Sequence, residues 1–151
     1  MRDWGHAADY CGAYHEMLLS LNKHNYANAT EMMSYVIATD QSCTVKDFVE
    51  EVYTKLGFQQ LHWSGAGVDE KLYGVVPQQG SATVVPQLLV EVDRAFFRPG
   101  EVPYLHGDTS KVRRELGWRA STSRSKLISE MIKYNQKLLE PRAASSQRPK
   151  L

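Results

Sequence analysis

A short apolar run at residues 35–38, Tyr35-Val36-Ile37-Ala38, limits what this chain can fold into more than any other feature. Its length and its β-branched residues favour a strand buried in a sheet. A helix pattern precedes it over residues 7–21, where apolar residues recur at three- and four-residue steps: Ala7, Cys11, Tyr14, Leu18 and Leu21. A helix followed by a buried strand predicts an α/β fold.

The remaining patterns mix helices and strands without a repeat. Thr44, three residues before Asp47, predicts the start of a helix that Gly57 ends. Strands are expected around 61–63, 71–75 and 88–92, a helix over 110–116 that ends at Gly117, and a last amphipathic helix around 127–132. Because regular strand-helix alternation is missing, we do not expect a complete doubly wound sheet.

Composition narrows the class of protein. With 151 residues, 42% of them apolar and 23% charged, the chain has the size of one globular domain and is neither fibrous nor mostly disordered. Eighteen basic against seventeen acidic residues leave a net charge of +1, so we expect no nucleic-acid partner and no anionic membrane surface as partner. Residues 140–151 are expected to form a disordered tail.

The lack of a recognisable targeting segment in the sequence predicts a cytoplasmic protein. The start of the sequence lacks the pattern of a signal peptide, and no window approaches the roughly 18 apolar residues of a membrane span. Cys11 and Cys43 lack CxxC spacing, which favours reduced thiols. The histidines show no ligand pairing, so no metal site is expected. The final Pro149-Lys150-Leu151 gives an alternative, a peroxisome-like organelle, since it is a weak variant of a peroxisomal address.

Four ordered motifs carry a resemblance to a known family. They are Arg2-Asp3-Trp4-Gly5-His6-Ala7 with Asp9-Tyr10, Tyr35-Val36-Ile37-Ala38-Thr39, Phe97-Arg98-Pro99 with Glu101-Val102, and Gly107-Asp108-Thr109-Ser110-Lys111 with Leu116-Gly117-Trp118. In this order they resemble the C-terminal part of GDP-mannose 4,6-dehydratases, members of the extended short-chain dehydrogenase/reductase superfamily. The resemblance covers residues 1–139.

The resemblance implies an enzyme of two lobes. An N-terminal Rossmann lobe would hold NADP, and a smaller C-terminal lobe would recognise GDP-mannose, which the family converts to GDP-4-keto-6-deoxymannose on the route to GDP-fucose. This chain would be the C-terminal substrate-binding portion, with the last Rossmann helix and strand but without the N-terminal dinucleotide-binding sheet. The helix over 7–21 and the strand at 35–38 would then leave an apolar face exposed.

The sequence lacks the motifs that the family uses to bind the cofactor and to catalyse the reaction. In the Gly-rich candidate at residues 65–70, Glu70 stands where a third glycine belongs, and no helix pattern follows. None of the eight tyrosines has a lysine four residues later, as the superfamily's catalytic pair requires. We therefore expect no catalytic residue and no bound cofactor in this chain alone. The alternative is a non-catalytic relic that serves binding or subunit assembly.

The expected site lies on the substrate side. Guanidinium groups bind diphosphates well, and a carboxylate suits ribose hydroxyls. By the resemblance, Arg2 and Arg98 would bind the diphosphate of GDP-mannose or GDP and Glu101 the ribose, with Pro99 fixing the turn between them. The alternative for each arginine is an ion pair. Expected protein partners are a missing N-terminal lobe, a homologous subunit or a second copy of the chain.

Other motif residues have structural interpretations. Trp4 and Trp118 are expected in the core or at a contact between lobes, and His6 and Asp9 at the helix start. Asp108 is expected to cap the following helix. Asp40 stands where the family usually has glycine, so a left-handed backbone is expected there at some cost.

Overall fold

The computed structural model describes residues 1–23, 34–77 and 85–139. The helices are α1 (Ala7–Lys23), α2 (Val45–Lys55), α3 (Ser110–Leu116) and α4 (Arg124–Leu139), with two single-turn 3₁₀ helices, η1 (Gly67–Asp69) and η2 (Arg94–Phe96). The strands are β1 (Arg2–Asp3), β2 (Ser42–Cys43), β3 (Gln59–Ser64), β4 (Lys71–Val75) and β5 (Gln87–Glu91). The expected α/β class is confirmed in this part of the chain.

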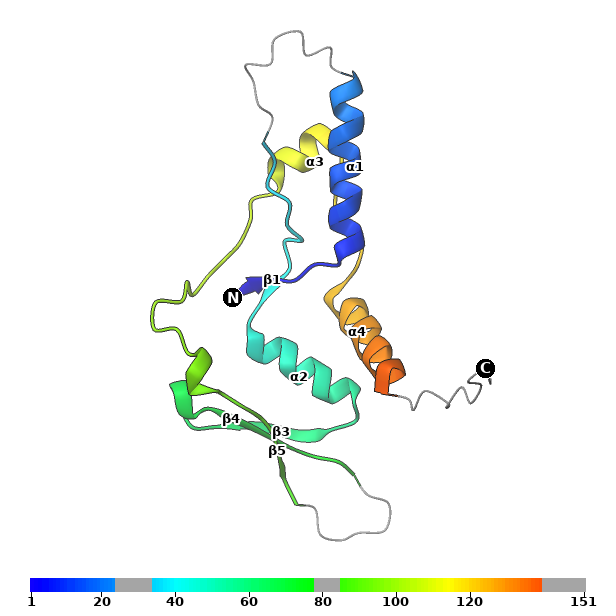
Figure 1. The fold of residues 1–151 in the computed structure, drawn as a ribbon. Coiled ribbons are helices and arrows are strands. Elements are labelled where there is room, and N and C mark those ends of the chain that lie inside the picture. The colour runs from blue at the N-terminus through cyan, green and yellow to red at the C-terminus, as the bar shows by residue number, and fades with distance from the viewer. Residues whose placement is uncertain (24–33, 78–84, 140–151) are drawn as a thin grey trace, which may run out of the picture.

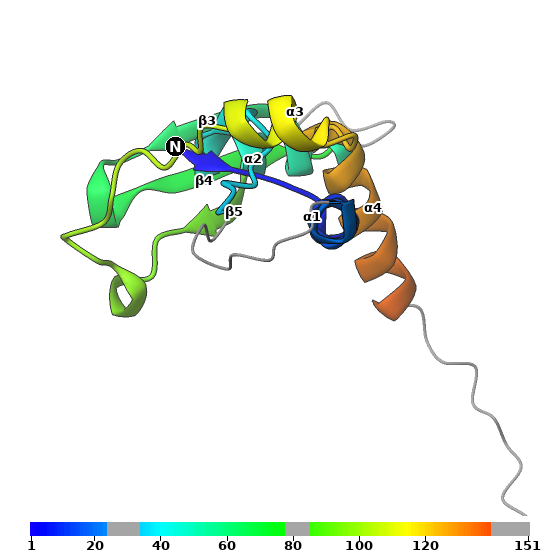
Figure 2. The same ribbon diagram turned by 90° about the horizontal axis from the view of Figure 1, so that it is seen from above.

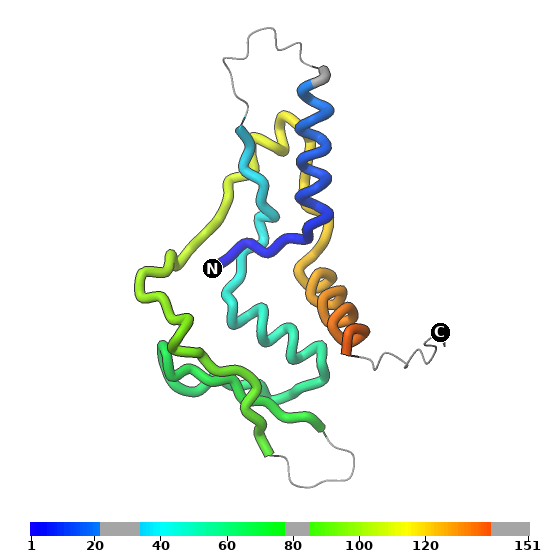
Figure 3. Tube along the Cα trace, in the orientation of Figure 1, coloured from blue at the N-terminus to red at the C-terminus, as the bar shows by residue number. Residues whose placement is uncertain are grey.

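Two small antiparallel sheets organise the molecule. Strands β3, β4 and β5 form a meander, and β1 pairs with β2 through Arg2 opposite Cys43. Helices α1 and α3 lie at the opposite end of the molecule from the meander (Figure 1). From β5 the chain runs back past β1 to α3 and then returns to α4 (Figure 3).

Helix α2 begins and ends where the sequence predicts. The Thr44 hydroxyl accepts a hydrogen bond from the amide of Asp47, whose carboxylate accepts from the Thr44 amide at 2.8 Å, so the two residues form a capping box. Hydrogen bonds from Thr44 lower the pKa of Asp47. Gly57 follows the helix with a φ of 91°, a left-handed backbone that glycine adopts without strain.

The main core lies between α1 and α3. Ala13, Val112 and Trp118 are buried together, with Met17 and Ile37 packed against them. A second contact joins α2 to α4, where the side chain of Ile128 is fully buried and Arg124 donates to Glu51 at 2.8 Å. Burial opposes ionisation of Glu51, but the hydrogen bonds from Arg124 and Ser125 lower its pKa overall. These two contacts attach α4 and α1 to the rest of the chain.

The strand expected at residues 35–38 is not formed, which corrects the prediction. The segment carries no β-bridge, and no strand lies beside it in the described part of the chain. A strand forms only when a neighbouring strand accepts and donates its backbone hydrogen bonds, so an apolar β-branched run does not become a strand without such a neighbour. The run is tied down at its end, where the Thr39 amide donates to the Asp3 carboxylate at 2.9 Å.

The apolar stripe predicted on α1 faces outward. Tyr14 is 59% exposed and Leu18 61% exposed, while Ala13, on the other side of the helix, is fully buried. The expectation that the helix would present an uncovered apolar face is thereby confirmed.

Two expectations fall on residues outside the described part, namely the disordered tail at 140–151 and the terminal Pro149-Lys150-Leu151. Among the described helices, none is long and apolar enough to cross a membrane.

Candidate functional site

One β-turn brings two of the three predicted site residues together. The Glu101 amide donates to the Arg98 carbonyl at 3.3 Å, and Pro99 and Gly100 occupy the two central positions. Proline is favoured at the first central position because its fixed φ matches the turn. The predicted role of Pro99 is confirmed, and Arg98 and Glu101 stand at the two ends of the same turn.

A groove of about 490 Å³ runs along this turn. It lies on the long connection between β5 and α3, which loops out on the side of the molecule away from α1 (Figure 2). Acidic, basic and aromatic side chains and one valine line it: Glu91, Val92, Asp93, Phe96, Phe97, Arg98 and Glu101. The groove is large enough for part of a small ligand.

Arg2 joins the site from a distant part of the sequence. Its guanidinium forms an ion pair with Glu101 and donates at 2.8 Å to the carbonyl oxygens of Val102 and Met1. The ion pair that the sequence offered as an alternative role is therefore present for Arg2. All three predicted residues are brought to one place, with Arg2 holding the segment after the turn to β1.

The other cations around the groove are matched by carboxylates. Lys71 lies 3.4 Å from Glu91, and Arg94 lies 2.6 Å from Asp69. Within the described part of the chain, Arg98 has no ion-pair partner. Arg98 is consequently the cation of the groove that is best placed to meet an anionic ligand.

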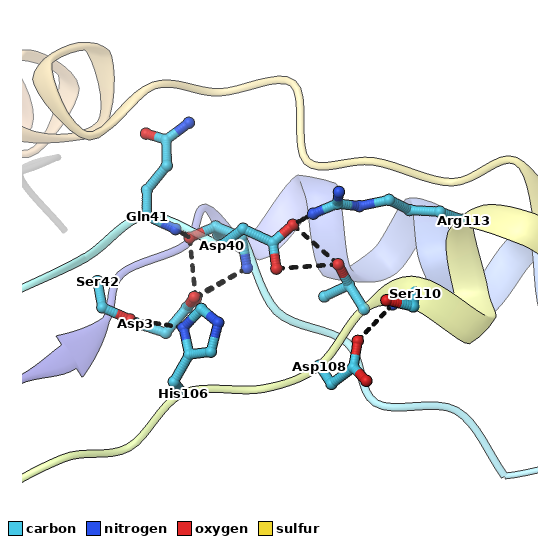
Figure 4. A network of polar contacts seen from close by, with 10 residues as sticks. Asp3, Asp40, Gln41, Ser42, His106, Asp108, Ser110 and Arg113 are labelled. Carbon is cyan, nitrogen blue, oxygen red and sulfur yellow. Dashed lines mark hydrogen bonds and ion pairs between the residues drawn. The ribbon is translucent and has the colours of Figure 1, made fainter.

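A second polar cluster surrounds Asp40. This residue has a φ of 60°, so the expected left-handed backbone is confirmed. Its carboxylate accepts from the Thr109 hydroxyl at 2.8 and 2.9 Å and pairs with Arg113, toward which it points in Figure 4. The sequence did not predict this pairing, because Asp40 and Arg113 are 73 positions apart and no pattern in the sequence indicates that they meet. The cluster fastens the end of the 35–38 run to α3.

Asp3 forms the neighbouring part of this network. Its carboxylate accepts from both the amide and the hydroxyl of Thr39, and Ser42 lies 3.2 Å from the His106 ring nitrogen Nδ1 (Figure 4). Asp3 also raises the pKa of Tyr10, although burial is the larger cause. Asp3 thus links β1 to the motif at residues 35–39, a role that sequence analysis missed.

The start of α1 is held by the residues expected there. The Ala8 amide donates to His6 Nδ1 at 3.1 Å, and His6 Nε2 lies 3.1 Å from Glu130 on α4. Asp9 accepts from the Ser121 hydroxyl at 2.8 Å and from the Thr122 amide at 3.0 Å. Burial opposes ionisation of Asp9, yet these hydrogen bonds hold its pKa below the ordinary value.

The remaining motif residues are structural. Trp118 is buried in the core and donates from Nε1 to the Asp9 carbonyl at 3.2 Å, while Trp4 stacks on Phe48 of α2 at 4.1 Å between ring centroids. Asp108 accepts from the Ser110 amide at 2.8 Å, although Thr109 occupies the N-cap position. The prediction that Asp108 is the N-cap is therefore wrong by one residue: Asp108 lies just before the N-cap and accepts from the first amide of α3.

Comparison with known proteins decides the family. A family model described as GDP-mannose 4,6 dehydratase matches residues 1–131. The chain belongs to the GDP-mannose 4,6-dehydratase family. It is similar to GDP-mannose 4,6-dehydratase of Vibrio cholerae serotype O1, with 37% identity over 134 residues, and to proteins of the same name from Drosophila melanogaster (36% over 138) and Homo sapiens (30% over 138).

The matches cover most of this chain but only a part of each dehydratase relative. These matches cover 87 to 91% of this chain but only 30 to 33% of each relative. The chain therefore spans about a third of the length of the curated relatives that it matches, which fits the C-terminal part predicted from its motifs.

The glycine-rich segment of this dehydratase family member does not fit a dinucleotide. Gly65, with a φ of 84°, begins a connection that passes through η1 and enters β4, so a strand follows the turn where a phosphate site needs a helix. A side chain at Gly65 would meet the carbonyl of Asp69. The segment is a connection between the strands β3 and β4. Among the described residues, no group of three or more metal-binding side chains gathers.

Proposed function

We propose that this chain is the GDP-mannose-binding part of a GDP-mannose 4,6-dehydratase. The observation that carries the proposal is the turn that sets Arg98, without an ion-pair partner in the described part of the chain, beside Glu101 in one groove. The guanidinium of Arg98 would bind the diphosphate, since a planar fork of donors matches phosphate oxygens. The Glu101 carboxylate would accept hydrogen bonds from the ribose hydroxyls.

Arg2 would take part by exchanging partners. Its guanidinium is shared between Glu101 and two backbone carbonyls. An incoming diphosphate offers a stronger negative charge to that guanidinium, and the ribose hydroxyls offer donors to Glu101. Both groups of the ion pair would thus remain satisfied when the ligand binds, because each gains a new partner.

Isothermal titration calorimetry with GDP tests the proposal. Arg98→Ala is expected to weaken GDP binding at least tenfold, since a charge-assisted contact to phosphate contributes about 1.5–3 kcal/mol. Arg114→Ala, on the exposed surface of α3, is the matched control and should leave the affinity unchanged. Equal affinities for the native chain and Arg98→Ala, or no GDP binding at millimolar ligand, would contradict the proposal.

We further propose that this chain is inactive alone. The sequence contains no Tyr-x-x-x-Lys pair, and its glycine-rich segment joins two strands. In the full-length family NADP would be held by the N-terminal part, which would also supply the catalytic groups. The purified chain, given GDP-mannose and NADP, should form no 4-keto product, and detectable product would refute this part of the proposal.

A second candidate function is subunit assembly by a non-catalytic relic. The exposed apolar face of α1, formed by Tyr14, Leu18 and Leu21, favours it. The partner would be a separate N-terminal lobe, a homologous subunit or a second copy of the chain. Mixing the chain with the part of the Vibrio cholerae relative that it does not match distinguishes the two. Restored dehydratase activity favours the first function, and a stable inactive complex favours the second.

The cytosol is the compartment we propose for the chain. Cys11 and Cys43 are both free thiols, which suits a reducing environment. A fluorescent fusion followed by fractionation tests this, and recovery in an oxidising compartment would refute it.

A further inference from the structure

Two consecutive aromatic side chains line the groove beside the phosphate-binding turn. Phe96 is 81% exposed and Phe97 is 48% exposed, and both border the same space as Arg98 and Glu101. Large aromatic groups bury 150 Å² or more when covered, so water-exposed phenyl rings in a groove are unfavourable unless something covers them.

The backbone holds this aromatic pair in a fixed place. Phe96 ends η2, where the Asp93 carboxylate accepts from the Ala95 amide at 2.8 Å. The Phe96 amide then donates to the Asp93 carbonyl at 3.1 Å, and the Phe97 amide to the Arg94 carbonyl at 3.3 Å. Two closed turns of backbone therefore precede the Arg98 turn, so the backbone that carries the two phenyl rings is ordered before a ligand binds, which lowers the entropic cost of binding.

The chemistry of the groove divides between these two segments. The turn provides a cation and a carboxylate, which suit the phosphates and the hydroxyls of a nucleotide. Neither group provides an apolar surface for the face of the base. The phenyl rings have no polar atom and cannot bind phosphate or sugar hydroxyls by hydrogen bonds. A planar heterocycle, however, stacks well on an exposed aromatic face.

We infer that Phe96 and Phe97 form the platform on which the nucleobase of the bound nucleotide stacks. The inference rests on the proposed binding of a nucleoside diphosphate in this groove and adds the residues that hold its base. Because every base has a flat π-face, stacking contributes affinity without choosing between guanine and adenine. Any discrimination between the two bases comes from other residues.

Titration of the 151-residue chain with GDP and with inorganic pyrophosphate tests the inference. Phe96→Ala should weaken GDP binding about tenfold and leave pyrophosphate binding unchanged, since pyrophosphate has no base to stack. Phe96→Trp should restore or strengthen GDP binding. Tyr134→Ala on α4, which removes an aromatic ring of 64% exposure outside the groove, is the matched control and should change neither affinity.

The outcomes separate this inference from the proposed function. If Arg98→Ala weakens both ligands while Phe96→Ala and Phe97→Ala weaken neither, the nucleotide site stands and the aromatic platform is refuted. If Phe96→Ala weakens GDP and pyrophosphate equally, the ring supports the fold of the turn and the platform is again refuted. If the native chain binds neither ligand, both the proposed function and the platform fail. Circular dichroism of each variant verifies that it is folded, as expected for so exposed a position.

Discussion

Arg2 and Glu101 form an ion pair across 99 positions of sequence, and the same guanidinium also binds two backbone carbonyls. Arg2 therefore does more than neutralise Glu101, because it fastens the segment after the Arg98 turn to β1. The two halves of the pair should consequently differ in their contribution to stability.

Replacing Arg2 should destabilise the chain more than replacing its partner. Arg2→Ala loses the ion pair and both carbonyl hydrogen bonds, and should lower the free energy of unfolding by about 1–2 kcal/mol. Glu101→Gln keeps the arginine on its carbonyls and loses only a partly exposed ion pair, which should cost under about 1 kcal/mol. Urea unfolding of both variants checks this, and equal losses would mean that the carbonyl bonds contribute nothing.

Asp40 should tolerate asparagine better than glycine. Glycine would relieve the left-handed backbone, but it would leave the hydroxyl of Thr109, a residue that is 3% exposed, without this acceptor and Arg113 without its carboxylate. The lost contacts outweigh the relief, so Asp40→Gly should be about 1 kcal/mol less stable than the native chain. Asp40→Asn keeps one acceptor oxygen and tolerates a left-handed backbone, so it should lie between the two. A glycine variant more stable than the native chain would show that backbone strain dominates.

Local rules predicted this fold better than long-range ones. The capping box at Thr44 and Asp47, the glycine after α2 and the turn around Pro99 depend on neighbours within three or four residues, and all were visible in the sequence. The strand predicted at 35–38 is not formed, because a strand also depends on which segments lie beside it.

In the candidate site, too, contacts between neighbours in the sequence could be predicted and long-range contacts could not. Its three residues were named from motif resemblance, and the β-turn that joins Arg98 to Glu101 could be anticipated from Pro99. The pairing of Arg2 with Glu101 and the hydrogen bonds of Asp3 could not, because each joins segments whose meeting depends on the whole fold. The exposed rings at 96 and 97 have apolar character in the sequence, and only their exposure marks them as unusual.

The Asp9 carboxylate should make stability depend on pH in the acid range. Its pKa in the folded chain lies below the ordinary value of 3.8, because hydrogen bonds from Ser121 and Thr122 outweigh the effect of burial. Asp9 therefore contributes stability above its unfolded pKa, and this contribution is lost as the pH falls through the folded pKa. The stability of Asp9→Asn should fall less with decreasing pH than that of the native chain. Urea unfolding midpoints measured from neutral pH downward give this comparison.

Ser121→Ala is the matched variant for this effect. It removes one of the hydrogen bonds that lower the pKa of Asp9, so the acid-dependent loss should shrink without disappearing. Some acid dependence should remain in both variants, since Asp47, Glu51 and Asp108 also have lowered pKa values. Identical pH profiles for the native chain and Asp9→Asn would assign the acid sensitivity to those other carboxylates.

The exposed and the buried side of α1 should respond differently to an introduced carboxylate. Leu18→Glu places a carboxylate on the exposed face and should leave the free energy of unfolding within about 0.5 kcal/mol of the native value. Ala13→Glu places it in the core against Val112 and Trp118, where an unpaired charge cannot be accommodated, and should prevent folding. Sedimentation velocity and thermal unfolding measure both effects.

If the exposed face is a contact surface, Leu18→Glu should also abolish complex formation with the unmatched part of the Vibrio cholerae relative while the chain itself stays folded. Complex formation that survives this substitution would exclude the outer face of α1 from the contact, because an introduced carboxylate buried at an interface has no partner there to offset its desolvation.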